Sequence, residues 1–193
     1  MTKPARALIV YAHPNSQSFN HALLETTIQG LKAAKMEVRV RDLYAEGFDP
    51  VLSASDIIST KQGKIPEDIA REQAELIWAT HLVLIYPIWW GDRPAILKGW
   101  FDRIFHYGFA HKGGQGLLVQ EKALVLQTTG EPAAYYGAAE KIPYFHPTIT
   151  EGTLHYCGIK DVHVHTFYAV PVVGKEQRQE MLEETGRIIA GWI

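Results

Sequence analysis

Three short stretches of the sequence combine hydroxyl, amide and aromatic side chains in a way suited to a flat, phosphorylated ligand. The first is His13–Asn20, HPNSQSFN, which directly precedes a segment with helical spacing of apolar residues. Free backbone N–H groups and the helix dipole favour a phosphate at such a position, although an ordinary N-cap at Ser16 or Ser18 would explain the same residues. The stretch matches neither G-x-G-x-x-G nor a P-loop, so it predicts no Rossmann dinucleotide fingerprint.

The second and third stretches supply aromatic rings and further donors. Trp89 and Trp90 lie together in the turn-rich segment Ile88–Arg93. Large apolar side chains in a surface loop favour association, so these rings are expected to stack on a flat cofactor or to be buried under the next helix or at a dimer contact. Thr128–Pro132 and Tyr135–Gly137 offer hydroxyl and backbone donors. A phosphate anchor, an aromatic wall and a donor loop together are what a flavin requires.

Alternating strand and helix segments must position these stretches. The expected strands are Ala7–Ala12, Met36–Arg41, His81–Pro87, Lys122–Gln127 and Asp161–Tyr168, and the expected helices are Ser18–Lys35, Glu67–Ala79, Pro94–Phe105, Thr150–Cys157 and Lys175–Trp192. This alternation predicts an α/β fold with a parallel sheet covered by helices on both faces. Ligands of such sheets bind beyond the carboxyl ends of the strands, where all three stretches lie. The segment Asp49–Pro66 has no periodicity and is interpreted as an irregular excursion.

Composition limits the class of protein. The chain has 193 residues, and 19 Lys+Arg against 21 Asp+Glu give a formal charge of −2. We expect one domain over residues 1–193 and no nucleic-acid partner, because phosphate neutralisation needs an excess of cations. No apolar stretch reaches the roughly 20 residues of a membrane helix, and Met1–Arg6 lacks a signal-peptide pattern. With a single cysteine, Cys157, a cytoplasmic location is expected. His163 and His165 share a strand face without an acidic or cysteine cluster, so no metal is expected.

The chain resembles the NAD(P)H:quinone oxidoreductase (DT-diaphorase) family of flavodoxin-like flavoproteins, which includes bacterial general-stress reductases and ancillary proteins of potassium efflux. The resemblance extends from the first strand to the last crossover. It rests on ALIVYAHPNSQSFN (Ala7–Asn20), RDLYAEGFDPVLS (Arg41–Ser53), YPIWWGDRPAILKGWFDRIF (Tyr86–Phe105), TTGEPAAYYG (Thr128–Gly137) and LHYCG (Leu154–Gly158).

The resemblance implies a flavodoxin-like, doubly wound, five-stranded sheet of order 2-1-3-4-5 and a homodimer with the flavin at its interface. It also implies two-electron ping-pong hydride transfer from NAD(P)H, through the flavin, to a quinone or another flat aromatic acceptor. The residues that it places around the flavin are His13, Ser18, Phe19, Asn20, Pro87, Ile88, Trp89, Trp90, Thr128, Thr129, Gly130 and Tyr136.

The sequence departs from the family in its proton-handling residues and at its end. Larger members have a histidine shortly after the tyrosine of the Thr-Thr-Gly loop, whereas Gly137–Ile142 has none, which leaves Tyr136 as the catalytic candidate and His146 as an approximate substitute. The large C-terminal extension is also missing. Similarity to FAD-binding members at Ser18–Asn20 favours FAD, with FMN as the alternative. An alternative function is a flavin-binding regulatory subunit of a glutathione-gated potassium-efflux transporter, a subgroup that shares TTGEP.

Overall fold

The computed structural model describes residues 5–137 and 142–193, and its centre is a parallel sheet. The strands run in the order β2 (Glu37–Asp42), β1 (Arg6–Tyr11), β3 (His81–Pro87), β6 (Lys122–Thr128) and β7 (Asp161–Phe167). Counted as the five sheet strands of the chain, this is the expected doubly wound order 2-1-3-4-5. The register pairs Leu8 with Leu82 and Leu82 with Ala123, so apolar residues meet across the three central strands.

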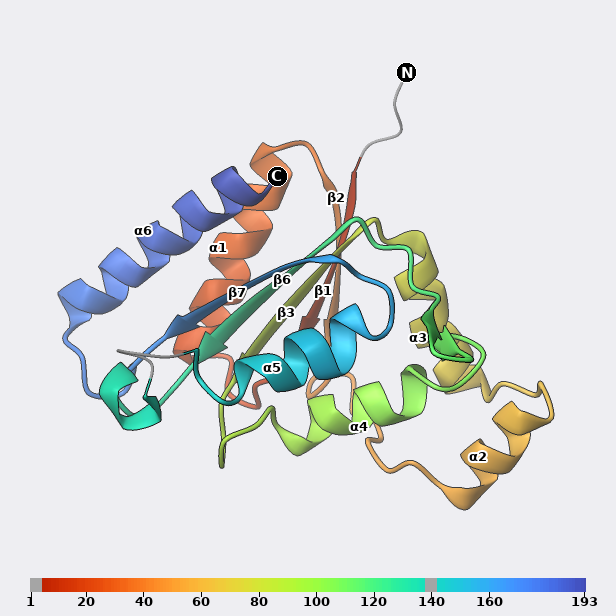
Figure 1. The fold of residues 1–193 in the computed structure, drawn as a ribbon. Coiled ribbons are helices and arrows are strands. Elements are labelled where there is room, and N and C mark those ends of the chain that lie inside the picture. The colour runs from red at the N-terminus through yellow and green to blue at the C-terminus, as the bar shows by residue number, and fades with distance from the viewer. Residues whose placement is uncertain (1–4, 138–141) are drawn as a thin grey trace.

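Helices cover both faces of the sheet because the central strands are apolar on both faces. Figure 1 shows α1 (Phe19–Ala33) and α6 (Lys175–Trp192) on one face, and α3 (Glu67–Trp78), α4 (Ala95–Ile104) and α5 (His146–Ile149) on the other. All seven residues of β3 are buried. Two apolar clusters result, one on each face, and the carboxyl ends of the strands remain available for a ligand.

The segment expected to be irregular contains a helix, α2 (Ala54–Lys61). A capping box starts it: the Asp56 N–H donates to Ser53 Oγ, and the Ser53 N–H donates to Asp56 Oδ2. Sequence periodicity missed α2 because its isoleucines, Ile57 and Ile58, are exposed and form no buried stripe. The helix is instead fixed by Arg103 of α4, whose Nε lies 3.1 Å from Asp56 Oδ2.

Other differences concern helix ends and short elements. The helix expected at Thr150–Cys157 begins earlier, as α5 followed by one π-helical stretch, η2 (Thr150–His155), because Pro147 occupies the first turn. Pro94 is the N-cap of α4 rather than its first residue. Three short elements were not expected: β4 (His111–Lys112), β5 (Gln115–Gly116) and the 3₁₀ turn η1 (Ala133–Tyr136).

Among the described residues, no helix is both long enough and apolar enough to cross a bilayer.

A close backbone approach joins the segment before α2 to α4. Gly99 lies in the middle of α4, and a Cβ atom there would overlap the carbonyl oxygen and Cβ of Pro50. Only glycine allows Pro50 to cross the helix at this distance. The crossing places Asp49 so that its carbonyl accepts a hydrogen bond from Arg103 Nη1 at 3.0 Å.

We predict that Gly99→Ala destabilises the protein by about 1–3 kcal/mol, the usual range for overpacking. At an exposed glycine in a helix, the same substitution would instead stabilise the protein, because alanine is about 0.5–1 kcal/mol more favourable than glycine in a helix. Gly186→Ala in α6 is the matched control, because nothing lies within 4 Å of its added Cβ. Chemical denaturation of both variants tests this, and equal stabilisation by the two substitutions would contradict the close approach.

Candidate active site

A cavity of about 690 Å³ opens at the carboxyl edge of the sheet, within the range usual for small-molecule sites. All twelve residues that the sequence assigned to the cofactor line it. They come from three loops: His13, Ser18, Phe19 and Asn20 after β1; Pro87, Ile88, Trp89 and Trp90 at the end of β3 and after it; and Thr128, Thr129, Gly130 and Tyr136 at the end of β6 and after it. The structure adds four residues that sequence reasoning missed: Gln17, Val170, Pro171 and Arg178.

Thr128 joins the three loops. Its Oγ1 accepts a hydrogen bond of 2.8 Å from Asn20 Nδ2, and its carbonyl accepts one of 2.7 Å from the Ile88 N–H. Both threonines of the loop are buried, and the next residue, Thr129, holds the end of β7 through its N–H to the Phe167 carbonyl at 2.9 Å. Asn20 is also buried, and its Oδ1 has no hydrogen-bond partner within the described part of the chain. The loops are therefore tied together through Thr128 and Thr129.

The loop after β1 offers neutral and backbone donors. Ser18 is the N-cap of α1, and its Oγ accepts from the His21 N–H at 3.2 Å, so the capping interpretation holds at Ser18 while the residue also lines the cavity. The first-turn amides of Phe19 and Asn20 have no acceptor inside the helix. His13 accepts the Asn15 N–H at Nδ1, and burial lowers its pKa, so the neutral ring carries its proton on Nε2.

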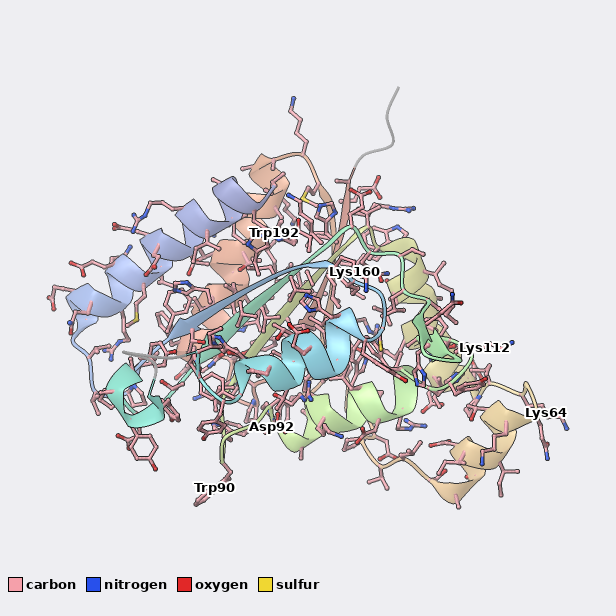
Figure 2. The ribbon with its side chains drawn as sticks, in the orientation of Figure 1. Lys64, Trp90, Asp92, Lys112, Lys160 and Trp192 are labelled. Atoms are coloured by element: carbon pink, nitrogen blue, oxygen red, sulfur yellow. The ribbon has the colours of Figure 1, made fainter. Side chains whose placement is uncertain are left out.

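The tryptophan loop is a tight turn in a strained conformation. The N–H and carbonyl groups of Trp89 and Asp92 bond reciprocally at 2.9 and 3.1 Å, and the two central residues, Trp90 and Gly91, have φ of 52° and 81°. This is a type I′ geometry, which normally takes Asn-Gly rather than tryptophan. The Trp90 side chain is fully exposed and projects away from the fold in Figure 2, whereas Trp89 packs beside His13 with ring centroids 5.7 Å apart. Backbone strain at an exposed aromatic residue is typical of functional sites.

Tyr136 is the tyrosine of the third loop that faces the cavity. It ends the 3₁₀ turn η1, and its ring packs against Phe145 with centroids 5.4 Å apart. Tyr135 is 74% exposed and is not among the cavity residues. Burial raises the pKa of Tyr136, so its hydroxyl stays protonated and remains a donor at neutral pH. Residues 138–141, which belong to the following segment without histidine, lie outside the described residues.

His146 lies under the sheet edge rather than on the cavity wall. Its Nε2 is 2.8 Å from Thr166 Oγ1, and that hydroxyl donates to Gln127 Oε1 at 3.1 Å, so the histidine must be the donor. The chain continues from Gln127 Nε2 to the Tyr86 hydroxyl at 2.6 Å. Burial lowers the pKa of His146, which keeps the ring neutral. His146 therefore reaches Tyr136 only through its neighbour Phe145.

Arg178 supplies the cavity with a cation. It comes from α6, more than forty residues beyond the third loop, and Nη1 donates to the carbonyls of Val173 and Val170 at 2.8 and 3.3 Å. These bonds hold the guanidinium beside a cavity that also receives the α1 N-terminus. No local sequence motif predicts that Arg178 lines the cavity, because only the turn after β7 brings α6 to the site. The donor set as a whole fits a flat ring joined to an anionic tail.

Comparison with known proteins identifies the family. The family model described as "Flavodoxin-like fold" matches residues 5–189. NAD(P)H dehydrogenase (quinone) 1 of Cavia porcellus is 33% identical over 97% of this chain and 74% of its own length. The solved NAD(P)H:quinone oxidoreductase from Methanothermobacter marburgensis is 31% identical, with a TM-score of 0.85 over 97% of this chain and 96% of that chain.

A third similarity is to the general stress protein 14 of Treponema denticola, solved in complex with FMN. It is 27% identical, with a TM-score of 0.64 over 98% of this chain and 97% of that chain. The order of strands, the three loops and these similarities agree with the resemblance drawn from the sequence motifs. The chain belongs to the flavodoxin-like family that contains the NAD(P)H:quinone oxidoreductases.

Proposed function

We propose that the protein is a flavin-dependent NAD(P)H:quinone oxidoreductase. Family membership makes it an oxidoreductase, since relatives that are similar to it over almost its whole length are named NAD(P)H dehydrogenase (quinone). The observation that carries the flavin is that one cavity gathers all twelve residues assigned to it, from three separate loops. A bound flavin would accept a hydride from NAD(P)H and then pass two electrons to a quinone or another flat aromatic acceptor in the same place.

The residues of the cavity have separate tasks in this proposal. The α1 N-terminus, the His13 Nε2–H and the Arg178 guanidinium would bind the phosphates. Trp89 and the backbone of Pro87 and Ile88 would flank the ring. The Tyr136 hydroxyl would hold a proton at the ring edge where negative charge develops, which stabilises that charge by hydrogen bonding. His146 would act indirectly, by fixing α5 so that Phe145 supports Tyr136.

We propose FAD as the flavin, with FMN as the alternative. Val170, Pro171 and Arg178 extend the cavity beyond the three loops and add a cationic side chain to the anion site at the helix N-terminus, which suits a diphosphate. The relative from Treponema denticola binds FMN, which keeps that alternative open.

We also propose that the chain works as a homodimer in the cytoplasm. Four aromatic side chains near the loop edge and the β4 hairpin are strongly exposed: Trp90, Tyr107, Tyr144 and Tyr156. A second copy would cover this apolar surface and exclude water from the cavity. The alternative role as a regulatory subunit of a potassium-efflux transporter rests on the TTGEP segment alone, and no feature of the described residues favours it.

The direct test is the cofactor of the purified protein. We expect a yellow protein with one flavin per chain, and mass spectrometry of the released cofactor distinguishes FAD from FMN. NADPH oxidation with menadione should follow ping-pong kinetics. A colourless protein that takes up neither flavin on titration would contradict the proposal.

We predict opposite effects of Trp90→Asn on stability and on function. Asparagine adopts positive φ more readily than tryptophan, and the exposed indole packs against nothing that would be lost. The expected stabilisation is about 0.5–1 kcal/mol, or about 1–4 °C in Tm for a chain of this size. Flavin retention or quinone turnover should fall, measured by flavin dissociation and steady-state kinetics. A loss of Tm without loss of either function would show that Trp90 is structural.

We predict that Tyr136→Phe slows flavin reduction by NADPH roughly ten- to a hundredfold, at and below the lower end of the range for one acid–base group. The ring packing against Phe145 is kept, so Tm should change little. Stopped-flow absorbance measures the rate, and Tyr135→Phe is the matched control because Tyr135 points to solvent. An unchanged rate in Tyr136→Phe with a large loss in Tyr135→Phe would move the role one residue upstream.

A further inference from the structure

A row of polar side chains crosses three strands of the sheet next to the cavity. Tyr86, Gln127 and Thr166 are register partners on β3, β6 and β7, so their side chains lie on the same face of the sheet. Tyr86 belongs to the apolar cluster on the α4 side, which makes this the face that α4 and α5 cover. The next residues on β3 and β6, Pro87 and Thr128, line the cavity. The row therefore lies one residue before the cavity wall.

Hydrogen bonds join the row from end to end and connect it to α5. The Thr166 hydroxyl donates to Gln127 Oε1 at 3.1 Å, and Gln127 Nε2 donates to the Tyr86 hydroxyl at 2.6 Å. From α5, His146 Nε2 donates to the Thr166 hydroxyl at 2.8 Å. Thr166 thus links the row on the sheet to the helix that covers it.

The row is polar although it is buried in an apolar cluster. Gln127 and Tyr86 are fully buried, and Thr166 is buried too. Hydrogen bonds of this kind add little net stability, because each one replaces a bond to water, and apolar residues of the same shape at all the linked positions would be about as stable. A fully bonded buried network instead favours one arrangement of the groups that it joins. The row is therefore expected to determine positions rather than stability.

The Thr166 end of the row lies close to the supports of Tyr136. His146 is the first residue of α5, and the ring of its neighbour Phe145 contacts both His146 and Tyr136, with centroid distances of 5.2 and 5.4 Å. The ring of Tyr168, two residues after Thr166, lies 6.3 Å from that of Tyr136. Two of the rings that pack against Tyr136 are therefore placed by residues at this end of the row.

We propose that the Thr166 hydroxyl is a positioning group for Tyr136. By accepting a hydrogen bond from His146 and donating one to Gln127, it fixes α5 to β7 and β6, and Phe145 then keeps the Tyr136 side chain in the cavity wall. The chemical consequence rests on the function proposed above, in which Tyr136 acts on the reduced flavin. Thr166, Gln127 and His146 are not among the residues that line the cavity, so they act through Tyr136 rather than on the flavin itself.

Hydrogen–deuterium exchange of the purified protein is the first measurement. Thr166→Val and Thr166→Ser form a matched pair, because valine keeps the branched shape without the hydroxyl and serine keeps the hydroxyl. We expect Thr166→Val to speed exchange in η1 and α5 about three- to tenfold, as for one lost hydrogen bond, and to leave α4 unchanged. Thr166→Ser should behave like the unmodified protein. Unchanged exchange of η1 and α5 in Thr166→Val would overturn the proposal, whether or not the protein contains a flavin.

Stopped-flow reduction of the flavin by NADPH is the second measurement. We expect Thr166→Val to slow reduction about three- to tenfold, less than Tyr136→Phe, because the Tyr136 hydroxyl is displaced rather than removed. The dissociation constant of the flavin should stay the same. In the Tyr136→Phe background, Thr166→Val should cause no further loss, since residues that act through one another are not additive. An equal loss in both backgrounds would show that Thr166 does not act through Tyr136 and would overturn the proposal.

Thr27→Val is the control for the loss of a buried hydroxyl elsewhere. Thr27 is fully buried in α1, and its hydroxyl has no hydrogen-bond partner among the described residues. We expect no change in the exchange of η1 and α5 or in the rate of flavin reduction. Changes as large as those in Thr166→Val would indicate general destabilisation and would overturn the proposal.

His146→Leu is the second variant, in case Thr166→Val does not fold. It removes the same hydrogen bond from the α5 side and should reproduce the faster exchange of η1 and α5. Normal exchange of these two elements in His146→Leu would equally overturn the proposal.

The two measurements separate this proposal from the proposed function. A protein that binds no flavin would contradict the proposed function, yet faster exchange of η1 and α5 in Thr166→Val would still support the hold of Thr166 on Tyr136. Faster exchange with an unchanged rate of flavin reduction would leave the oxidoreductase function intact and overturn the role of Thr166 in it.

Discussion

The site depends on Thr128, because this residue is bonded to both of the other loops that form the cavity. Its side chain holds Asn20 at the start of α1, and its carbonyl holds Ile88 at the start of the tryptophan loop. Parallel strands place their carboxyl ends at one edge, but the edge alone does not fix loop positions to the few tenths of an ångström that ligand contacts require. Thr128, at the end of β6, does so: its buried hydroxyl accepts from Asn20 and its carbonyl accepts from the Ile88 N–H.

Two departures from ordinary folding rules lie at the cavity. Trp90 adopts a positive φ, and Asn20 Oδ1 is buried without a partner in the described structure. Others lie elsewhere: Lys35 also has a positive φ, and Thr27 Oγ1 and Gln120 Oε1 are buried without partners among the described residues. Local rules are often broken at functional sites, and the two departures at the cavity come from two different loops.

Residue patterns predicted the parallel α/β sheet, the main helices and the three loops of the cavity, because buried parallel strands and loop chemistry are local signals. The order of the strands and the twelve individual residues came from the resemblance to the family. Three features could not be predicted. Helix α2 is fixed by an arginine 47 positions away rather than by an apolar stripe of its own. Arg178 reaches the cavity only through the turn after β7. The role of His146 depends on which ring nitrogen meets Thr166, and no sequence motif reports the direction of a side chain.

The two outer strands of the sheet resist pairing with another sheet. On β2, Glu37, Arg39 and Arg41 alternate with two valines, and on β7, Asp161, His163 and His165 do the same. Polar and charged side chains along an edge strand disfavour the addition of a further strand, whether from another folded copy or from a partly unfolded chain. Growth of the sheet from copy to copy is thereby disfavoured at both edges. The protein therefore combines exposed aromatic side chains in its loops with edge strands that disfavour aggregation.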